Sequence, residues 1–387
     1  MANDFTTIAG KILARGVLAL REEAVFPRTV NTDWGTEVAQ VGDTVNVPIP
    51  TPQASGNVVP DVVPPATTDN AIRTVPLVLD QWKKSEFHLT DKQLGEIDAK
   101  ANFLPMQASE AIRTLANLIN SAGWLNYKGV YGYVGTAGTT PFAIGSGSFA
   151  NPPTDATNVR KTLNKQVAPP NNRRLVLDPD AEAQALNLPA LANFEQTDDR
   201  DVKIEGRLGR KYGFDWYYDQ QMPTHTKGAA GTALLDDTVA RAVGLKTLHM
   251  DGFTTKPSVG DVFTIAGDAQ TYVVTASTVL VGTDSDVSFE PGLKVAIPAA
   301  DGNEAVTFKA SHVVNLGYHR DAFAFATRPV ASMAFKGGNL IIQTTDPQTG
   351  VSLAMEIRRG YHLTIFEYSV LFGTALIRPE LAVRLAG

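Results

Sequence analysis

The clearest periodic pattern of apolar positions lies between residues 94 and 131. Ala108, Ile112, Leu115, Ile119 and Ala122 recur at the spacing that places side chains on one face of a helix, with Leu118 and Leu125 beside them. Pro105 suits the first turn of such a helix, where its missing N–H leaves no hydrogen bond unmade. The stretch therefore predicts a long amphipathic helix.

A second helical pattern opens the chain. Phe5, Ile8, Ile12, Ala19 and Leu20 follow helical spacing around Leu13 and Val17. Because the residue before a proline disfavours helical geometry, we expect this helix to end near Phe26 and Pro27. The pattern fits a helix packed on its own subunit, and it also fits an arm that reaches a neighbouring subunit.

Between residues 41 and 78, prolines interrupt short β-branched runs. They stand at positions 48, 50, 52, 60, 64, 65 and 76. Proline cannot donate a hydrogen bond to a sheet, so the pattern predicts an extended ribbon or edge structure rather than a central strand. Such an arm has little core of its own, and its valines and isoleucines favour a segment that is stabilised by lying on another chain.

The middle of the chain predicts a compact α/β unit followed by an all-β module. Glycines between residues 129 and 147 indicate loops, and then a helix over 155–167, a strand over 173–178 and a helix over 181–188 follow. Beyond His225 we expect strands at 262–265, 271–275, 279–281, 287–289 and 293–297. Their alternating apolar positions suit a small barrel that folds by itself. Three further strands are expected between residues 352 and 384, around Gly360 and Gly373.

Composition places the 387-residue chain among folded proteins of more than one domain, with 43% hydrophobic and 19% charged residues. A formal net charge of -6 disfavours a protein whose main work is to grip nucleic acid, because neutralising phosphates requires clustered Lys and Arg. The absence of cysteine excludes disulfides, thiolate nucleophiles and cysteine-ligated metals. Lys11 and Arg15 interrupt the apolar residues at the start of the chain, so we expect no signal peptide. No stretch elsewhere is long and apolar enough to span a membrane, so we expect no membrane span and folding in the cytoplasm.

Patterns that carry catalysis or bind cofactors are absent from the sequence, which has no P-loop, no zinc-binding His-Glu-x-x-His and no Gly-x-Ser-x-Gly. We therefore expect no enzyme activity and no cofactor. His312 and His319 would have to converge in space to bind a metal. The acidic run at 198–201 lacks calcium-loop spacing and is better explained as a solvated loop.

Two further groups of residues resemble sites that carry chemistry. Arg207, Arg210 and Lys211 precede the aromatic run at 216–218 and resemble a nucleic-acid patch, yet Asp215 and Asp219 interrupt it, which favours a strand with half-buried aromatics. A hydrolase built on His319 and Asp321 would need a nucleophile that the sequence does not supply.

Several short strings of residues occur in a fixed order along nearly the whole chain. They lie at 18–23, 41–45, 87–90, 135–141, 174–179, 205–210, 213–215, 223–226, 315–323 and 378–385, with Asn31 and Trp34 between the first two. In this order they resemble one family: the major coat proteins of tailed bacteriophages with the Hong Kong 97 fold, of the short-tailed Salmonella-phage type with an inserted domain. Each string is weak alone, and their shared order is what makes the likeness specific.

The resemblance implies an α+β capsid fold with six parts. These are an N-terminal arm (1–35), an extended loop with flanking strands (36–90), a peripheral domain with a spine helix (91–135), an axial domain (136–224), an inserted small β-barrel (225–312) and return strands (313–387). It also implies a shell subunit that forms hexamers and pentamers around double-stranded DNA in a virion assembled in the host bacterial cytoplasm.

Partners implied in the same way are copies of the chain itself, a scaffolding protein, a portal, non-specifically contacted DNA and a decoration protein. The residues expected to make self-assembly contacts are Trp34, Val45, Val47, Ile49, Val58, Val59, Arg73, Arg207 and Arg210. The alternative from another class is a β-rich tail or adhesin component that binds carbohydrate, which the all-β module alone would allow.

Overall fold

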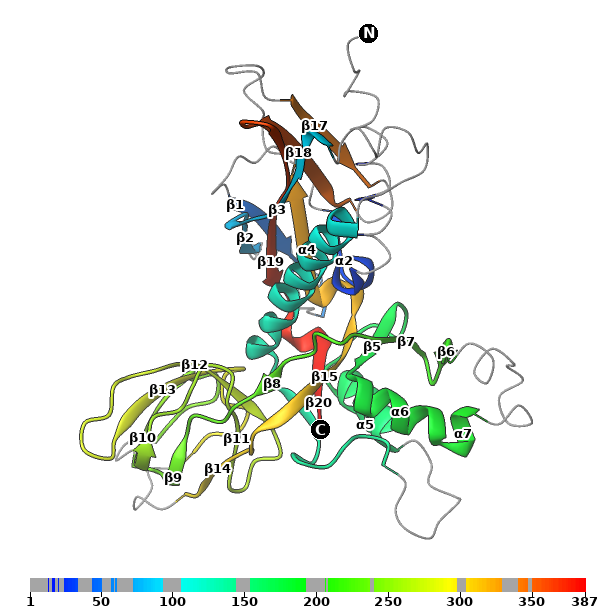
Figure 1. Ribbon diagram of the computed structural model, residues 1–387. Coiled ribbons are helices and arrows are strands. Elements are labelled where there is room, and N and C mark those ends of the chain that lie inside the picture. Colours follow the sequence, from blue (N-terminus) through cyan, green and yellow to red (C-terminus); the bar gives the residue numbers. More distant parts are fainter. Residues whose placement is uncertain are drawn as a thin grey trace. The chain divides into compact units, whose positions relative to one another are not determined.

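The structure is a computed structural model that describes residues 13, 16–17, 20, 24–33, 44–50, 57–58, 60, 72–92, 106–143, 154–192, 206, 208–236, 240–297, 304–328, 340–346 and 350–387. These residues form a mixed α+β structure, as predicted (Figure 1). The chain divides into two compact units. Unit 1 contains Met1–Leu18, Thr32–Ala111 and Ala324–Ile377, and unit 2 contains Ala19–Asn31, Ile112–Phe323 and Arg378–Gly387.

Unit 1 is built on a five-stranded sheet. Its long strand β19 (Leu363–Leu376) pairs antiparallel with β18 (Ser352–Arg359) and with β3 (Gln81–Thr90), while β17 (Leu340–Thr345) extends the sheet beyond β18 and β16 (Phe323–Arg328) lies at the other end of the strand order. Phe87 and Phe366 lie opposite each other on β3 and β19 with stacked rings, 5.1 Å between centroids. Apolar cross-strand pairs of this kind stabilise a sheet more than the backbone ladder alone.

The predicted arm contributes a two-stranded antiparallel hairpin to unit 1. Strand β1 (Thr44–Ile49) pairs with β2 (Arg73–Val78), and alternate residues of β1 are buried. Val45, Val47 and Ile49 pack with Leu77 and Leu79 of the hairpin segment and with Ala324, Ala326 and Ile377. The two strands are therefore buried against other segments of their own chain, whereas the sequence favoured packing on another chain.

Unit 2 contains a seven-stranded mixed sheet in the order β4–β20–β15–β5–β7–β6, with β8 beside β15. The strands are β4 (Gly132–Gly135), β20 (Ala382–Ala386), β15 (His312–His319), β5 (Arg173–Leu177), β7 (Phe214–Tyr218), β6 (Arg210–Lys211) and β8 (Thr224–His225). Strand β4 lies in the glycine-rich stretch that was expected to be loop. Gly132 is required there because a Cβ atom would press on the side chains of Gln166 and Val383.

Helices of unit 2 cover this sheet close to the predicted positions. Helix α5 (Thr154–Lys165) buries Ala156, Val159 and Leu163, and helix α6 (Pro179–Asn187) follows β5 before the short α7 (Pro189–Ala192). The α6 N-terminus has Asp178 as its cap, whose carboxylate accepts the N–H of Asp180. Strand β7 then runs parallel to β5, as a strand after a crossover helix does.

The long predicted helix is α4 (Met106–Trp124), continued by the 3-10 turn η2 (Leu125–Gly129). Ala108, Ile112, Leu115 and Ile119 are buried along one face, whereas Leu118 and Leu125 are exposed. Residues 94–105 lie outside the described part of the chain, as does most of the predicted N-terminal helix, although Leu13, Val17 and Leu20 are helical and buried.

Pro27 does not end a helix. It lies inside the short helix α2 (Val25–Thr29), at its third residue. The first turn tolerates proline because its N–H would have no intrahelical acceptor there. Ala24, which precedes α2, is extended, so α2 is a separate helix from the opening one. Residues 21–23 lie outside the described part of the chain, and the predicted end of the opening helix stays a prediction.

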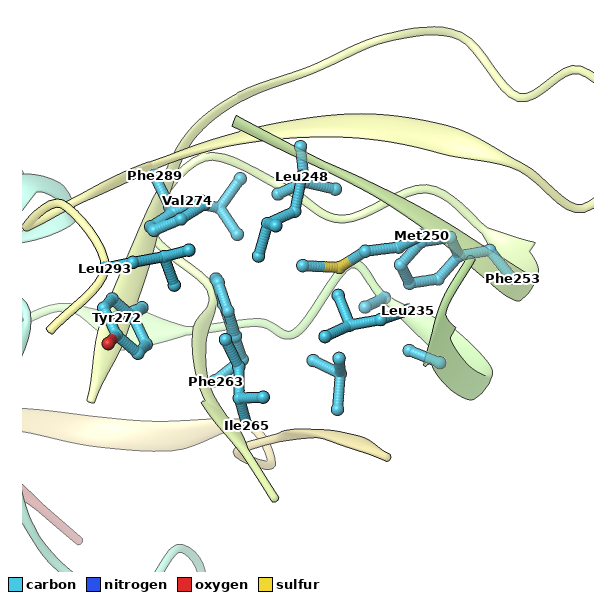
Figure 2. Packing of buried hydrophobic residues seen from close by; sticks show 14 residues of the cluster. Leu235, Leu248, Met250, Phe253, Phe263, Ile265, Tyr272, Val274, Phe289 and Leu293 are labelled. Atoms are coloured by element: carbon cyan, nitrogen blue, oxygen red, sulfur yellow. The ribbon is translucent and has the colours of Figure 1, made fainter. Parts of the chain in front are cut away.

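The all-β module is a six-stranded antiparallel sheet in unit 2, in the order β14–β11–β12–β13–β10–β9. Its strands are β9 (Ala230–Leu235), β10 (Thr247–Thr255), β11 (Val262–Ile265), β12 (Tyr272–Ser277), β13 (Ser285–Glu290) and β14 (Val306–Phe308). A bridge between Leu234 and Ala305, with the Leu235 N–H donated to the Glu304 carbonyl at 3.1 Å, brings the two ends of the strand order together. Figure 2 shows Leu248, Met250 and Phe263 directed into the shared interior.

Two predicted strands of this module are absent. Residues 279–281 lead from β12 to the turn at 282–283 without forming a strand, apart from an isolated bridge between Val281 and Asp284, and Val279 and Val281 are 77% and 78% exposed. Residues 293–297 are irregular apart from one bridge between Ile297 and Arg241. The strands over 262–265, 271–275 and 287–289 are confirmed.

The end of the chain forms the three expected strands, β18, β19 and β20. Gly373 does not separate two of them but lies inside β19, where a Cβ atom would collide with the Val78 carbonyl oxygen. The break comes later, at the 3-10 turn η4 (Pro379–Leu381), and a similar turn, η3 (Arg320–Ala322), joins β15 to β16.

Candidate functional site

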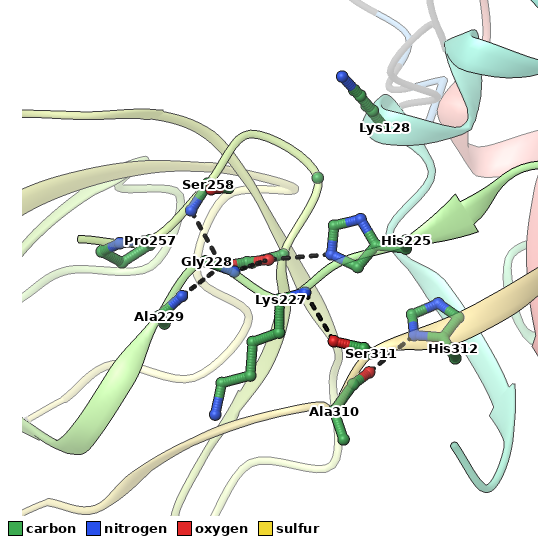
Figure 3. Close-up of polar contacts among 12 residues, drawn as sticks. Lys128, His225, Lys227, Gly228, Ala229, Pro257, Ser258, Ala310, Ser311 and His312 are labelled. Atoms are coloured by element: carbon green, nitrogen blue, oxygen red, sulfur yellow. Dashed lines mark hydrogen bonds and ion pairs between the residues drawn. The ribbon is translucent and has the colours of Figure 1, made fainter. Parts of the chain in front are cut away.

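A group of buried polar side chains in unit 2 lies where the chain passes between its two sheets. It leaves the seven-stranded sheet after β8 and returns at the start of β15, with His225 paired opposite His312. We call residues 224–228 and 310–313 the neck. Figure 3 shows the two imidazoles there, 5.3 Å apart between ring centroids, and both are buried.

Asp261 of the six-stranded sheet holds one side of the neck. Its buried carboxylate accepts Nε2–H of His225 at 2.9 Å and the backbone N–H groups of Gly228, Ala229 and Ser258 at 2.9 to 3.2 Å. Burial raises the pKa of this carboxyl group, but the hydrogen bonds from His225 and the three N–H groups outweigh burial and leave the pKa below its ordinary value. Asp261 is therefore a carboxylate at neutral pH.

The proton position on His225 follows from its two partners. Because the Asp261 carboxylate can only accept, Nε2 carries the proton, and Nδ1 then accepts the hydroxyl of Tyr127 at 3.0 Å. Tyr127 comes from η2, which precedes β4. Burial raises the pKa of Tyr127, although nearby Arg384 lowers it in part, so the hydroxyl keeps its proton and remains a donor.

Arg384 of β20 links the seven-stranded sheet to the residues just before β11, next to the neck. Its fully buried guanidinium donates from Nη1 to the Gly260 carbonyl at 2.7 Å and from Nη2 to the Lys128 carbonyl at 3.2 Å. The guanidinium also lies over the Tyr127 ring, 4.9 Å from its centroid. Burial lowers the pKa of Arg384 to about 10, so it remains a cation at neutral pH.

His312 stands in contrast to His225 because no carboxylate is among its hydrogen-bond partners in the described part of the chain. Nδ1 donates to the Ala310 carbonyl at 2.8 Å, and the buried Nε2 has no hydrogen-bond partner among the described residues. Burial lowers the pKa of His312 to about 4, so the ring is neutral at pH 7. The ring of Tyr133 packs edge-on against it.

Hydrogen bonds of carbonyls, a carboxylate and a guanidinium join the two sheets of unit 2 here, while Nε of Arg384 and Nε2 of His312 make none among the described residues. No group of three or more His, Asp or Glu side chains that could hold a metal ion occurs among the described residues. None of the described helices is long and apolar enough to cross a membrane.

Sequence reasoning found the positions of His225 and His312 as boundaries but missed Asp261 and Arg384 as their partners. The available signal was a lone arginine inside the apolar strand Ala382–Ala386. Such a residue in a buried strand requires carbonyl or carboxylate partners.

The residues predicted to make self-assembly contacts lie in different environments. Val45, Val47 and Ile49 are buried in the core of unit 1, whereas Val58 is 94% exposed and Arg73 is exposed. Arg210 is exposed and lies 3.7 Å from the Asp215 carboxylate. Trp34, Val59 and Arg207 fall outside the described residues.

The other candidate groups have ordinary structural roles. His312 and His319 stand at opposite ends of β15, so they do not converge on a metal. Nδ1 of His319 accepts the N–H of Asp321 at 3.2 Å and thereby caps η3. Trp216 is buried against Phe142 and donates to the Lys211 carbonyl, as expected for a strand with half-buried aromatics. The acidic run at 198–201 lies outside the described residues.

Comparison with known proteins gives only distant likenesses. No protein-family model matches the chain, and no curated protein matches it by sequence. Similar solved structures include a chain of Mycobacterium phage Che8, at 12% identity over 94% of this chain and 90% of that chain, with a TM-score of 0.48. A chain from the capsid structure of the cyanophage P-SCSP1u is 12% identical over 93% of this chain and 86% of that chain, with a TM-score of 0.46.

A chain from the capsid of a native GTA particle is 11% identical over 94% of this chain and 90% of that chain, with a TM-score of 0.46. Identities of 11 to 12% with TM-scores below 0.5 are too low for these likenesses to assign a fold family or a function.

Proposed function

We propose that the chain is the major capsid protein of a tailed bacteriophage, a non-enzymatic subunit that assembles into the hexamers and pentamers of an icosahedral head around double-stranded DNA. Its fold is then Hong Kong 97-like, with the six-stranded sheet as an inserted small barrel. Its partners are further copies of itself, a scaffolding protein, a portal, non-specifically bound DNA and a protein that decorates the outer surface.

The observation that carries the proposal is the ordered series of sequence strings that resemble this family. In the structure, several of these strings lie at or near the end of one helix or strand and the start of the next. The string at 87–90 completes β3, the string at 174–179 spans most of β5 and the start of α6, and the string at 378–385 covers η4 and most of β20. Residues at such junctions set the path of the chain, so a shared order of junction strings supports a shared path.

Exposed apolar side chains of unit 1 give independent support. Val58, Ile72, Trp82 and Tyr361 are all exposed in the single chain. A protein that worked as a free monomer would leave these side chains in water, whereas contacts between subunits would cover them. Repeated many times over a closed shell, such small contacts supply the stability of the assembly.

Sedimentation velocity of the purified, freshly expressed chain tests the proposal, with the scaffolding protein of the same virus added where one is known. The expected result is conversion of monomers into closed particles of megadalton mass. A chain that stays monomeric under these conditions and binds immobilised carbohydrate would instead support the tail or adhesin alternative. Trp82→Ser and Tyr361→Ser are expected to weaken assembly without unfolding the monomer, and Val279→Ser, at an exposed position of the other unit, is the matched surface control.

A further inference from the structure

His312 is a buried imidazole, and its surroundings in the neck disfavour its protonation. Its Nδ1–H is already committed to the Ala310 carbonyl, so an added proton would go to Nε2. That atom is buried and has no hydrogen-bond partner among the described residues, so the new N–H would face no acceptor. A buried donor without an acceptor, on a ring that has just become charged, destabilises the closed arrangement.

The charged and titratable groups around His312 add to this effect. From β20 the Arg384 cation and from β8 the imidazole of His225 both disfavour a positive charge on the ring. From the six-stranded sheet the Asp261 carboxylate favours it, but that carboxylate is already shared among four N–H donors. From β4, Tyr133 presents a neutral ring, over which Lys309 places another cation at 5.7 Å.

We propose that the neck is an acid-sensitive latch: protonation of His312 releases the six-stranded sheet from the seven-stranded sheet while both sheets stay folded. The inference rests on the geometry of the neck and does not depend on the proposed function.

Release without unfolding follows from how the apolar core is divided. Fourteen buried apolar residues form the interior of the six-stranded sheet. By contrast, the buried apolar cluster that joins this sheet to the start of β4 contains Tyr131, Val262 and Val273, with Tyr133 against it. The apolar contact at the joint is therefore small beside the interior of the six-stranded sheet, and the hydrogen bonds of Arg384, Asp261 and Tyr127 act together with it.

The sign and size of the effect follow from linkage. A histidine whose pKa is lowered in the closed state stabilises that state above the pKa of the open state, and the stabilisation is lost as pH falls toward the closed-state value. For an exposed pKa of 6.5 and a closed-state pKa of about 4, the ratio of open to closed neck rises about 60-fold between pH 7 and pH 4.5.

Amide hydrogen exchange of the full chain, read residue by residue or by short peptides and corrected for the intrinsic pH dependence of exchange, measures this ratio. The reporters are the N–H groups of Lys227, bound to Ser311 Oγ, and of Val314, bound to the Pro223 carbonyl. The references are the N–H groups of Phe289 in the six-stranded sheet and of Asp219 beside the seven-stranded sheet.

The expected result is loss of protection at the two reporters by about 60-fold between pH 7 and pH 4.5, with both references unchanged. His312→Asn keeps a side-chain N–H for the Ala310 carbonyl but cannot titrate, so it should remove this pH dependence. His249→Gln, at a more exposed histidine of the six-stranded sheet, should leave it intact.

Three results would overturn the proposal: reporters that stay protected at pH 4.5, references that lose protection together with the reporters, or unchanged pH dependence in His312→Asn. Should the Asn variant not fold, an NMR titration of the His312 ring in the unmodified chain decides the matter. A pKa near 4 supports the latch, and a pKa near 6.5 contradicts it.

Discussion

Replacing Asp261 by alanine tests how much the neck contributes to stability. The substitution removes the acceptor for three backbone N–H groups and for Nε2–H of His225, and it removes the carboxylate whose charge favours the Arg384 cation. The imidazole can move its proton to Nδ1 and so avoid an unmade bond, but the backbone N–H groups have no such option.

The magnitude follows from these unmade bonds. Each buried N–H left without an acceptor costs about 1–3 kcal/mol, and breaking a buried charged network typically costs about 3–5 kcal/mol. Since the groups around Asp261 are partly buried, we expect Asp261→Ala to lower the free energy of unfolding by about 3–5 kcal/mol. Asp261→Asn keeps one acceptor oxygen and should lose less, about 1–3 kcal/mol.

Urea unfolding at pH 7, followed by far-ultraviolet circular dichroism, measures both losses through the shift of the midpoint. The control is Asp286→Ala, because Asp286 also accepts a bond from a histidine, at 2.8 Å, but is exposed. Exposed pairs contribute about 0–1 kcal/mol. The reasoning is refuted if Asp261→Ala is no more destabilising than this control.

Other substitutions test the packing of each unit. Leu77→Ala should lower the free energy of unfolding by about 2–5 kcal/mol in thermal or urea unfolding, because Leu77 is buried in the hairpin core, whereas the exposed Val58→Ala should change it little. Gly373→Ala should cost about 1–3 kcal/mol, because its Cβ would press on the β2 backbone, and an unchanged midpoint would contradict this contact. The double substitution Val279→Ser and Val281→Ser should stay within about 0.5 kcal/mol of the parent, since both side chains are exposed. Residues 225–312 made alone should unfold cooperatively with about 3–5 kcal/mol of stability, and collapsed, random-coil amide NMR signals would refute it.

Elements with strong local patterns could be predicted from the sequence. Helix α5, strand β5 and helix α6 lie close to where their local patterns place them, and the predicted bounds of β11 match the structure over its full length. In these segments the local preference and the tertiary environment agree, so the pattern alone was sufficient.

Elements that depend on distant partners could not be predicted. Strand β4 is a strand only because β20, far along the chain, pairs with it, and its glycines gave a loop signal. The burial of Val45, Val47 and Ile49 likewise depends on Ala324 and Ala326. A proline-rich arm and a buried hairpin have the same local sequence signature, so the tertiary partner decides between them.

Only part of the candidate site could be predicted from the sequence, for the same reason. His225 and His312 mark where the strand pattern changes, which local sequence can show. The hydrogen bonds around the two histidines require Asp261 and Arg384, which lie 123 positions apart in the sequence and come close together only in the folded unit. A buried arginine in an apolar strand indicates that partners exist but does not identify them.

Cryo-electron microscopy of the particles formed by the expressed chain tests the central proposal most directly. The account predicts closed icosahedral shells built from hexamers and pentamers, with one copy of the chain in each subunit position and the six-stranded sheet resolved as a separate lobe of density. Tubes, amorphous aggregates or monomers under conditions in which the chain is folded would contradict it.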